Sequence, residues 1–265
     1  MTEGSTPRQA WQVRDGVAEI VDDLTVEEPM EIRIDGTAVA VVMRTPGHDA
    51  DLALGFALTE GIISDPSSLA GIDELGDGRW DLRTTDDVSV DASRFQRNFY
   101  ATSSCGVCGK ASIDAIRVAG VRPPPGPVVT QDVVRSLPDR LAREQELFSR
   151  TGGLHAAALF DETGQFLVVR EDIGRHNAVD KVIGDVAGRT WPLPELGLAV
   201  SGRISFEITQ KAAVAGIGLV CGVSASSSLA VDLADEFGIT VVGFVRDPGF
   251  TVYAGPHRIE GLARP

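Results

Sequence analysis

The sequence predicts a mixed α/β fold with two parts of different character, and three observations indicate it. From residue 154 to residue 245, apolar segments of strand length alternate with helical segments, which is typical of a sheet covered by helices on both faces. The first half has shorter elements and reads as a small α+β module. Between the halves lies a proline-rich stretch at residues 121–127, which cannot continue a helix or an inner strand.

The composition limits the classes of protein to consider. A chain of 265 residues with 43% hydrophobic content can bury a sizeable core. No apolar run spans a bilayer, and residues 1–8 lack a signal-peptide pattern, so we expect a cytoplasmic protein with no membrane partner. A net charge of −14 disfavours nucleic-acid binding, although an acidic surface can dock basic partner proteins. Three cysteines, two of them closely spaced, argue against a disulfide framework.

The first half divides into a tail and a module. Residues 1–15 are expected to be a disordered tail, and residues 16–120 a small α+β module that ends in a loop with two cysteines. Alternating residues on both sides of an Asp-Gly pair are typical of a hairpin, and Gly61 is a typical helix stop. The expected elements are a hairpin over residues 31–43, a helix over 49–60 and short strands between 71 and 91.

The second half is expected to begin after a linker at residues 121–130 and to form one domain over residues 131–265. Thr130 predicts the N-cap of a helical region that runs to about Arg150 and is interrupted at Pro138. The elements expected after it, in order, are strands at 154–160 and 166–170, a helix at 176–186, a strand at 198–200, a helix at 206–215, a strand at 219–223, a helix at 227–237 and a strand at 240–245.

The two closely spaced cysteines, Cys105 and Cys108, form a C-x-x-C pair with a glycine after each and Lys110 beyond. Glycine allows close approach to the backbone, and a nearby lysine and helix start stabilise the reactive thiolate. Three interpretations remain open from the loop alone. A zinc site needs four ligands and one C-x-x-C gives two; a thioredoxin-like redox pair needs a βαβ setting; a carrier cysteine passes on a group such as sulfur.

Three polar segments, at residues 171–181, 201–207 and 224–228, follow strands that should end at one edge of the sheet. Open α/β sheets bind ligands at that edge. Backbone N–H groups and hydroxyls at helix starts suit anions, and the guanidinium of Arg203 suits phosphate. Each segment also has a structural interpretation, such as Ser226 or Ser228 as an N-cap and an Asp172–Arg175 ion pair. Together they favour a phosphate-bearing ligand.

Other chemistry-bearing residues carry weaker signals. Cys221 lies in an apolar strand and is expected to be a buried structural thiol. His155 is equally consistent with a core and a site residue. Arg246 follows the last strand at the ligand-binding edge and is a second candidate for phosphate contact. The chain has no G-x-G-x-x-G with a following acid, no P-loop, no zinc-deaminase signature and no nucleophile elbow.

Taken together, these segments resemble the FdhD/NarQ family of formate dehydrogenase accessory sulfurtransferases. The resemblance runs from residue 45 to about residue 253 and departs from the family at Ser226–Ser227, where members often carry Pro-Thr. Five motifs carry it: S-C-G-V-C-G-K at 104–110, T-G-G-L-H-A-A at 151–157, E-D-I-G-R-H-N-A-V-D-K at 171–181, S-G-R-I-S-F-E at 201–207 and S-L-A-V at 228–231.

The resemblance implies a fold and a function. It implies a cytidine deaminase-like α/β core joined to a smaller module, in a homodimer. It also implies that Cys105 accepts sulfur from a cysteine desulfurase as a persulfide and passes it to the molybdenum or tungsten of a bis-molybdopterin guanine dinucleotide cofactor for formate dehydrogenase. Cys108 would assist, and no stably bound metal is expected. The implied and candidate cofactor-binding residues are Phe244, Val245, Arg246, Asp247, Pro248, Gly249, Arg203 and His176.

Rival classes are also consistent with the residues. A zinc-binding scaffold would contain stoichiometric metal and lose its fold with a chelator. A thiol–disulfide oxidoreductase would need both Cys105 and Cys108 to reduce a model disulfide. A nucleotide-binding accessory protein would bind a guanine nucleotide but would not depend on Cys105.

Overall fold

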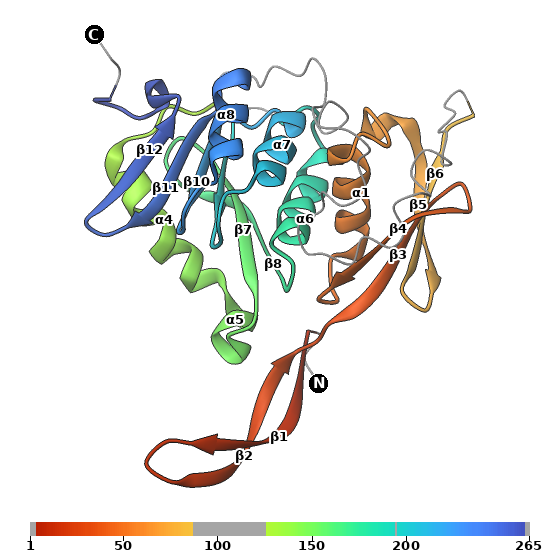
Figure 1. Ribbon diagram of the computed structural model, residues 1–265. Coiled ribbons are helices and arrows are strands. Elements are labelled where there is room, and N and C mark those ends of the chain that lie inside the picture. The colour runs from red at the N-terminus through yellow and green to blue at the C-terminus, as the bar shows by residue number, and fades with distance from the viewer. Residues whose placement is uncertain (1–3, 87–125, 194, 263–265) are drawn as a thin grey trace.

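The computed structural model of the chain describes residues 4–86, 126–193 and 195–262 (Figure 1). It has an α/β fold, as predicted, with a six-stranded sheet, a four-stranded sheet and a separate two-stranded sheet. Helices lie between the two larger sheets, and the two-stranded sheet projects away from the rest of the molecule (Figure 1). No helix of the described ranges is long and apolar enough to cross a membrane.

The projecting sheet is a hairpin of β1 (Ser5–Val13) and β2 (Val17–Thr25), which we call the arm. The expected disordered tail over residues 1–15 is therefore wrong for residues 5–13. These residues pair with β2 along their whole length, from Ser5 opposite Thr25 to Val13 opposite Val17. Cross-strand pairing supplies hydrogen bonds that the composition of the first fifteen residues does not reveal.

The small module contains β3 (Glu28–Ile34), β4 (Thr37–Arg44), β5 (Leu69–Gly76) and β6 (Arg79–Thr84), with the short 3₁₀ helix η1 (Pro66–Ser68) before β5. Asp35 and Gly36 both have positive φ, at 46° and 75°, which is the conformation required of the hairpin turn that was predicted there. Helix α1 (Asp49–Thr59) packs on this sheet through Leu52 and Leu58, which are buried against Ile32.

The second part is built on the six-stranded sheet, in the order β12-β11-β10-β9-β7-β8. Neighbouring residues along β7 point to opposite faces of the six-stranded sheet. Ala157 and Leu159 pack with α6 and α7 on one face, whereas Ala158 and Phe160 pack with α4 on the other. The strands are β7 (His155–Phe160), β8 (Phe166–Asp172), β9 (Gly197–Val200), β10 (Leu219–Gly222), β11 (Thr240–Arg246) and β12 (Gly249–Ala254). The helices are α4 (Gln131–Glu144), α5 (Glu146–Thr151), α6 (Arg175–Ala187), α7 (Phe206–Ala215), α8 (Ser228–Phe237) and the 3₁₀ helix η3 (Pro256–Arg258).

The helical region after Thr130 begins as expected, since the Thr130 hydroxyl accepts a hydrogen bond of 3.2 Å from the Val133 N–H. The expected interruption at Pro138 is wrong, because Pro138 lies inside α4 and the break falls at Gln145. Proline removes one backbone hydrogen bond from a helix, and the buried face of α4, with Val134, Leu137 and Leu141, continues across it.

The two parts meet where α1 crosses α6. A Cβ built on Gly55 would lie 1.9 Å from the Asp180 carbonyl oxygen, and one built on Gly184 would lie 1.9 Å from the Asp51 carbonyl oxygen. The two backbones are therefore in contact, which only glycine permits. The linker expected at 121–130 is described only from residue 126, and Val129 there pairs with Ile259 of the second part.

Candidate functional site

One edge of the six-stranded sheet collects the polar segments. Strands β9, β10 and β11 are parallel, and β8 runs in the same direction because both β8 and β9 are antiparallel to β7. The carboxyl ends of four strands therefore meet the amino end of β7 at one edge, which we call the site edge. All three polar segments follow strands that end there, as the sequence predicts.

Backbone hydrogen bonds hold two loops of the site edge to each other and to the end of β11. The Ile204 N–H donates to the Ala225 carbonyl at 3.1 Å, and the Ser227 N–H donates back to the Ile204 carbonyl at 3.0 Å. The Phe244 N–H donates to the Ser224 carbonyl at 3.0 Å. The loops after β9 and β10 and the end of β11 thus form one connected rim. Ser227 caps α8, so the expected caps at Ser226 and Ser228 are wrong by one residue.

His155, Arg175 and Arg203 converge on this edge. His155 opens β7, and a Cβ on Gly202 would lie 3.2 Å from its Nδ1, so glycine is what lets the loop pass so close. Burial lowers the pKa of His155, and the nearby guanidinium groups of Arg175 and Arg203 lower it further. The imidazole is therefore neutral at pH 7 and lies in a positive field.

The two arginines are available to an anion. Neither forms an ion pair with any residue that the structure describes, although the chain as a whole is strongly acidic. The Nε of Arg175 is also buried without a hydrogen-bond partner in the described part of the chain. Arg203 is exposed at the rim. A buried donor without a partner costs free energy, so a bound anion at this position would be stabilised by both guanidinium groups.

His176 lies beside them in the first turn of α6. Its Nε2 is 3.4 Å from the Ser205 hydroxyl and 3.7 Å from a carboxylate oxygen of Glu207. Burial, followed by the positive charges of Lys211 and Arg175, lowers its pKa to about 3. Both contacts use the same ring nitrogen, so the three residues do not form a nucleophilic triad, in which the two nitrogens have separate partners.

Most of the other polar residues in the segment at 171–181 are structural. The Asp172 carboxylate pairs with Lys181 at 2.8 Å and accepts from the Thr45 N–H at 3.1 Å and from Asn177 at 2.9 Å. The structural alternative of an Asp172–Arg175 ion pair is therefore wrong, because Lys181 of α6 reaches the buried carboxylate instead. The Glu171 carboxylate accepts from two N–H groups at the start of α5. Arg175 and His176 remain to contact a ligand.

The candidate segment Phe244, Val245, Arg246, Asp247, Pro248 and Gly249 covers the end of β11, the two residues between the strands and the start of β12. Phe244 has φ of 51° and is 38% exposed as a residue, with the Arg246 guanidinium 5.7 Å from its ring centroid. The side chain of Val245 is buried in the core and is not available to a ligand. Arg246 and Asp247 are exposed. The segment thus offers an aromatic face and a cation at the rim.

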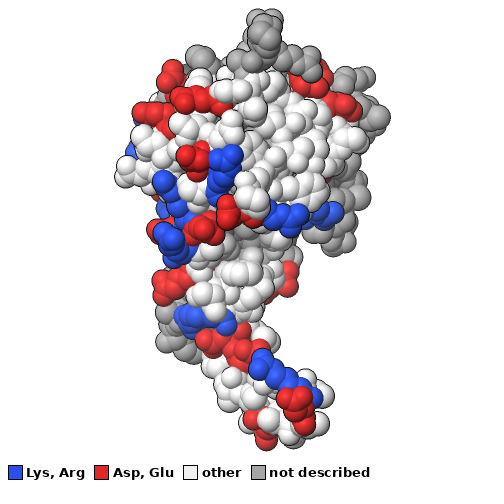
Figure 2. Space-filling view, turned by 90° about the vertical axis from the view of Figure 1, so that its left-hand side faces the viewer, with Lys and Arg blue, Asp and Glu red and all other residues white. Residues whose placement is uncertain are grey.

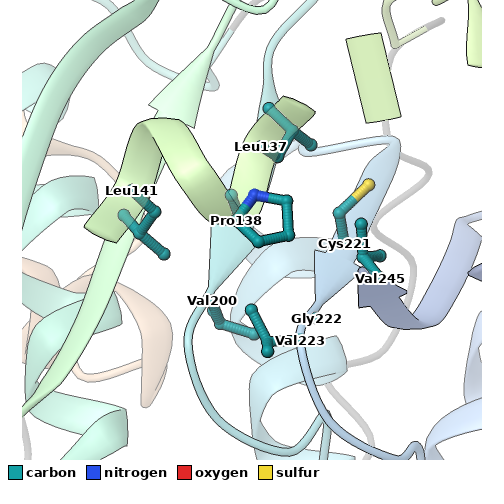
Figure 3. A pocket seen from close by; sticks show the side chains of 9 residues that line it. Leu137, Pro138, Leu141, Val200, Cys221, Gly222, Val223 and Val245 are labelled. Atoms are coloured by element: carbon teal, nitrogen blue, oxygen red, sulfur yellow. The ribbon is translucent and has the colours of Figure 1, made fainter. Parts of the chain in front are cut away.

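Cys221 is a buried structural thiol, as expected. It is 2% exposed, and burial raises the pKa of the thiol far above its usual value. Figure 3 shows it beside a cavity of about 10 Å³ lined by Leu137, Pro138 and Val245, among others. This space holds at most a water molecule, so Cys221 is not in a ligand site.

Cys105 and Cys108 lie outside the described residues, and their roles stay predictions. The described ranges contain no group of three or more His, Cys, Asp or Glu side chains that could hold a metal ion. The sequence interpretation left His155 open and gave an ion pair with Asp172 as the structural alternative for Arg175. The Gly-Gly pair before His155 and the run Gly174-Arg175-His176 at a helix start are the signals that could have identified both residues.

The chain is similar to known proteins over most of its length. The model of the FdhD/NarQ family matches residues 25–260. The chain is 47% identical to the sulfur carrier protein FdhD of Streptomyces avermitilis over 95% of its own length and 94% of the relative's. It is 48% identical to the sulfur carrier protein FdhD of Mycobacterium tuberculosis over 90% and 92% of the two chains.

A solved structure shares the fold. The crystal structure of a formate dehydrogenase accessory protein from Desulfotalea psychrophila superposes with a TM-score of 0.77 at 22% identity, covering 97% of this chain and 99% of the other. At that identity the likeness concerns the fold. The match of the family model over most of the chain, together with the two relatives, shows that this chain belongs to the FdhD/NarQ family.

Proposed function

We propose that this protein is a sulfur carrier for formate dehydrogenase. The observation that carries the proposal is that relatives at 47% and 48% identity, matched over nine-tenths or more of both chains, are sulfur carrier proteins. In this role the protein is a sulfurtransferase, with Cys105 as the residue that carries the sulfur. The thiol must be kept reduced, which fits a cytoplasmic location.

The loading step is a thiol–persulfide exchange. The Cys105 thiolate attacks the outer sulfur of a persulfide on a cysteine desulfurase, a new S–S bond forms on Cys105, and the desulfurase leaves as a thiolate that takes up a proton. Cys108 would release the sulfur. Its thiolate attacks the inner sulfur of Cys105, a Cys105–Cys108 disulfide forms, and sulfide departs with the two electrons that the disulfide formation supplies.

The acceptor is the metal of a bis-molybdopterin guanine dinucleotide cofactor, bound as substrate at the site edge. The Arg175 and Arg203 guanidinium groups, with no ion pair among the described residues, suit its phosphates. The exposed ring of Phe244, with Arg246 beside it, offers a stacking surface for a guanine base. The homodimer expected for this family is part of the proposal.

The test of sulfur loading is intact mass after incubation with a cysteine desulfurase and free cysteine. We expect a gain of one sulfur atom that a reductant reverses, that Cys105→Ala abolishes and that Cys221→Ala leaves unchanged. Cys221 is a matched control because it is a thiol that no partner can reach. No gain in the wild type, or an equal gain in Cys105→Ala, would contradict the proposal.

The test of acceptor binding is titration with GDP, the simplest probe of the guanine nucleotide part. Arg175→Gln and Arg203→Gln should each weaken the affinity by about tenfold, which corresponds to about 1.4 kcal/mol. Arg189→Gln is the control, because Arg189 is an exposed arginine just beyond the C-terminal end of α6 that pairs with Asp185. GDP binding without sulfur loading would instead favour a nucleotide-binding accessory protein, and stoichiometric zinc in the sample a zinc scaffold.

A further inference from the structure

The arm carries much of the exposed apolar surface of the molecule. Trp11, Val13 and Val21 are each 71% exposed and Val17 is 68% exposed. A two-stranded hairpin on its own is marginally stable in water. The arm projects from the body, and among the described residues it touches the body only near its base (Figures 1 and 2), so the other described residues do not cover these side chains. An exposed apolar surface of this kind marks an interaction site.

The strand register places these residues on one face. Val13 pairs with Val17, Trp11 with Glu19 and Gln9 with Val21. Directly opposed residues of an antiparallel pair point to the same side of the sheet, and so do residues two positions apart along a strand. Three valines and a tryptophan therefore form a continuous apolar face over the outer half of the arm, with Glu19 as the charged residue among them.

The charges of the arm indicate what it binds. On the apolar face, Glu19 forms no ion pair with any described residue and Asp23 at the base pairs with Arg150 at 2.9 Å, whereas Asp22 lies on the other face, opposite Arg8. Packing of this face on the same face of a second copy about a two-fold axis would bury two Glu19 carboxylates in an apolar interface to which neither copy of the face contributes a lysine or arginine. The complement is an apolar surface of a different protein, bordered by lysine or arginine.

The base of the arm is fixed beside the site edge. The Thr25 hydroxyl hydrogen-bonds to the Thr151 hydroxyl at 2.9 Å, and Arg150 donates to the Ser5 hydroxyl at 2.8 Å. A Cβ on Gly153 would lie 2.8 Å from the Thr25 hydroxyl. Thr151 ends α5, and His155 opens β7 directly afterwards. A protein held on the arm therefore lies alongside the residues that we assign to the acceptor cofactor.

We propose that the apolar face of the arm docks the client formate dehydrogenase, through an apolar strip with basic residues opposite Glu19. Docking there presents the opening of the client's cofactor site to the site edge. The inference rests on the proposed function, because it takes the client to be the protein that receives the sulfurated cofactor. It adds where the client binds and which residues it contacts.

The experiment measures binding of the purified, full-length protein to the cognate formate dehydrogenase apoprotein. The test variant is Trp11→Thr/Val13→Thr/Val21→Thr, because threonine keeps the strand preference and removes apolar surface. We expect its affinity for the client to fall by about tenfold or more. Glu19→Lys should weaken binding as well, and the loss should shrink as salt is added. Leu75→Thr, an exposed apolar residue on β5, is the matched control and should bind like wild type.

Two further measurements separate the outcomes. Sulfur loading of Cys105 and GDP binding should be unchanged in the arm variants. If the wild-type protein shows neither sulfur loading nor GDP binding, the proposed function is wrong, and this outcome is distinct from a failure of the docking site. Unchanged client affinity in both arm variants overturns the docking site. Light scattering that shows wild type as a dimer and the triple variant as a monomer, with client affinity retained, would also overturn it and assign the arm to a second copy.

Discussion

The ammonium group of Lys211 on α7 lies 2.9 Å from the carboxylate of Asp180 on α6, and both side chains are buried. The same ammonium reaches the Glu60 carboxylate at 3.0 Å and the Thr59 hydroxyl at 2.9 Å, at the end of α1. One buried cation thus joins the small module to α6, which carries His176 in its first turn, and to α7, which has Ser205 as its N-cap. The two carboxylates raise the pKa of Lys211 above its usual value.

Lys211→Met should therefore destabilise the protein strongly. Removing one partner of a buried ion pair leaves the other charge without compensation, which typically costs about 3–5 kcal/mol. Denaturant unfolding followed by circular dichroism measures the loss. Lys211→Met/Asp180→Leu should recover much of it, because the uncompensated Asp180 charge is then removed. A single variant as stable as wild type would show that the ion pair contributes nothing.

Gly184→Ala should separate α1 from α6. The new Cβ would lie 1.9 Å from a backbone oxygen of Asp51, which no rotamer change can relieve, so the helices must move apart. Overpacking of a close contact costs about 1–3 kcal/mol or more. The melting temperature measures it. Gly188→Ala is the control, since nothing lies within 4 Å of its Cβ and its φ is −63°, and it should be nearly neutral.

The free energy of unfolding should decrease as the pH falls, because of His176. Its pKa is about 3 in the folded protein against 6.5 for a free imidazole, so the unfolded chain binds the extra proton between these values. The contribution is present above about pH 6.5 and is lost as the pH falls towards 3, by up to about 1.4 kcal/mol per pH unit. His176→Gln should flatten this slope in unfolding measurements, whereas exposed His257→Gln should not. An equal slope in His176→Gln and wild type would contradict the assignment.

Gly202→Ala should disturb the site edge without a large loss of stability. The added Cβ would lie 3.2 Å from His155 Nδ1, so the imidazole or the loop must shift by a few tenths of an ångström. Because Arg203 is the next residue, we expect weaker GDP binding with a melting temperature close to that of wild type. Isothermal titration measures the affinity. Full affinity in Gly202→Ala would mean that the rim tolerates the shift and that His155 and Arg203 do not act together.

Local signals predicted those elements that local interactions determine. The Asp35-Gly36 turn requires positive φ at both residues, and glycine and aspartate adopt this conformation readily. The position of the β3–β4 hairpin could therefore be predicted from the Asp-Gly pair alone. The Thr130 cap and the apolar strands β9, β10 and β11 were likewise readable from short windows. The same kind of short-range signal gave a wrong prediction at Pro138, where a helix break was expected. Burial of the apolar face of α4 outweighs the loss of one backbone hydrogen bond there.

The sequence by itself determined the fold class, the polar segments at the strand ends and the resemblance to the family, because these depend on residue type and spacing along the chain. Only the tertiary structure decided that Lys181, and not Arg175, pairs with Asp172, and that His155 lies beside Gly202. It also decided that residues 5–13 are a strand. In each case the deciding contact joins segments distant in sequence or competes with a nearer partner, and the folded geometry alone selects among partners of equal chemistry.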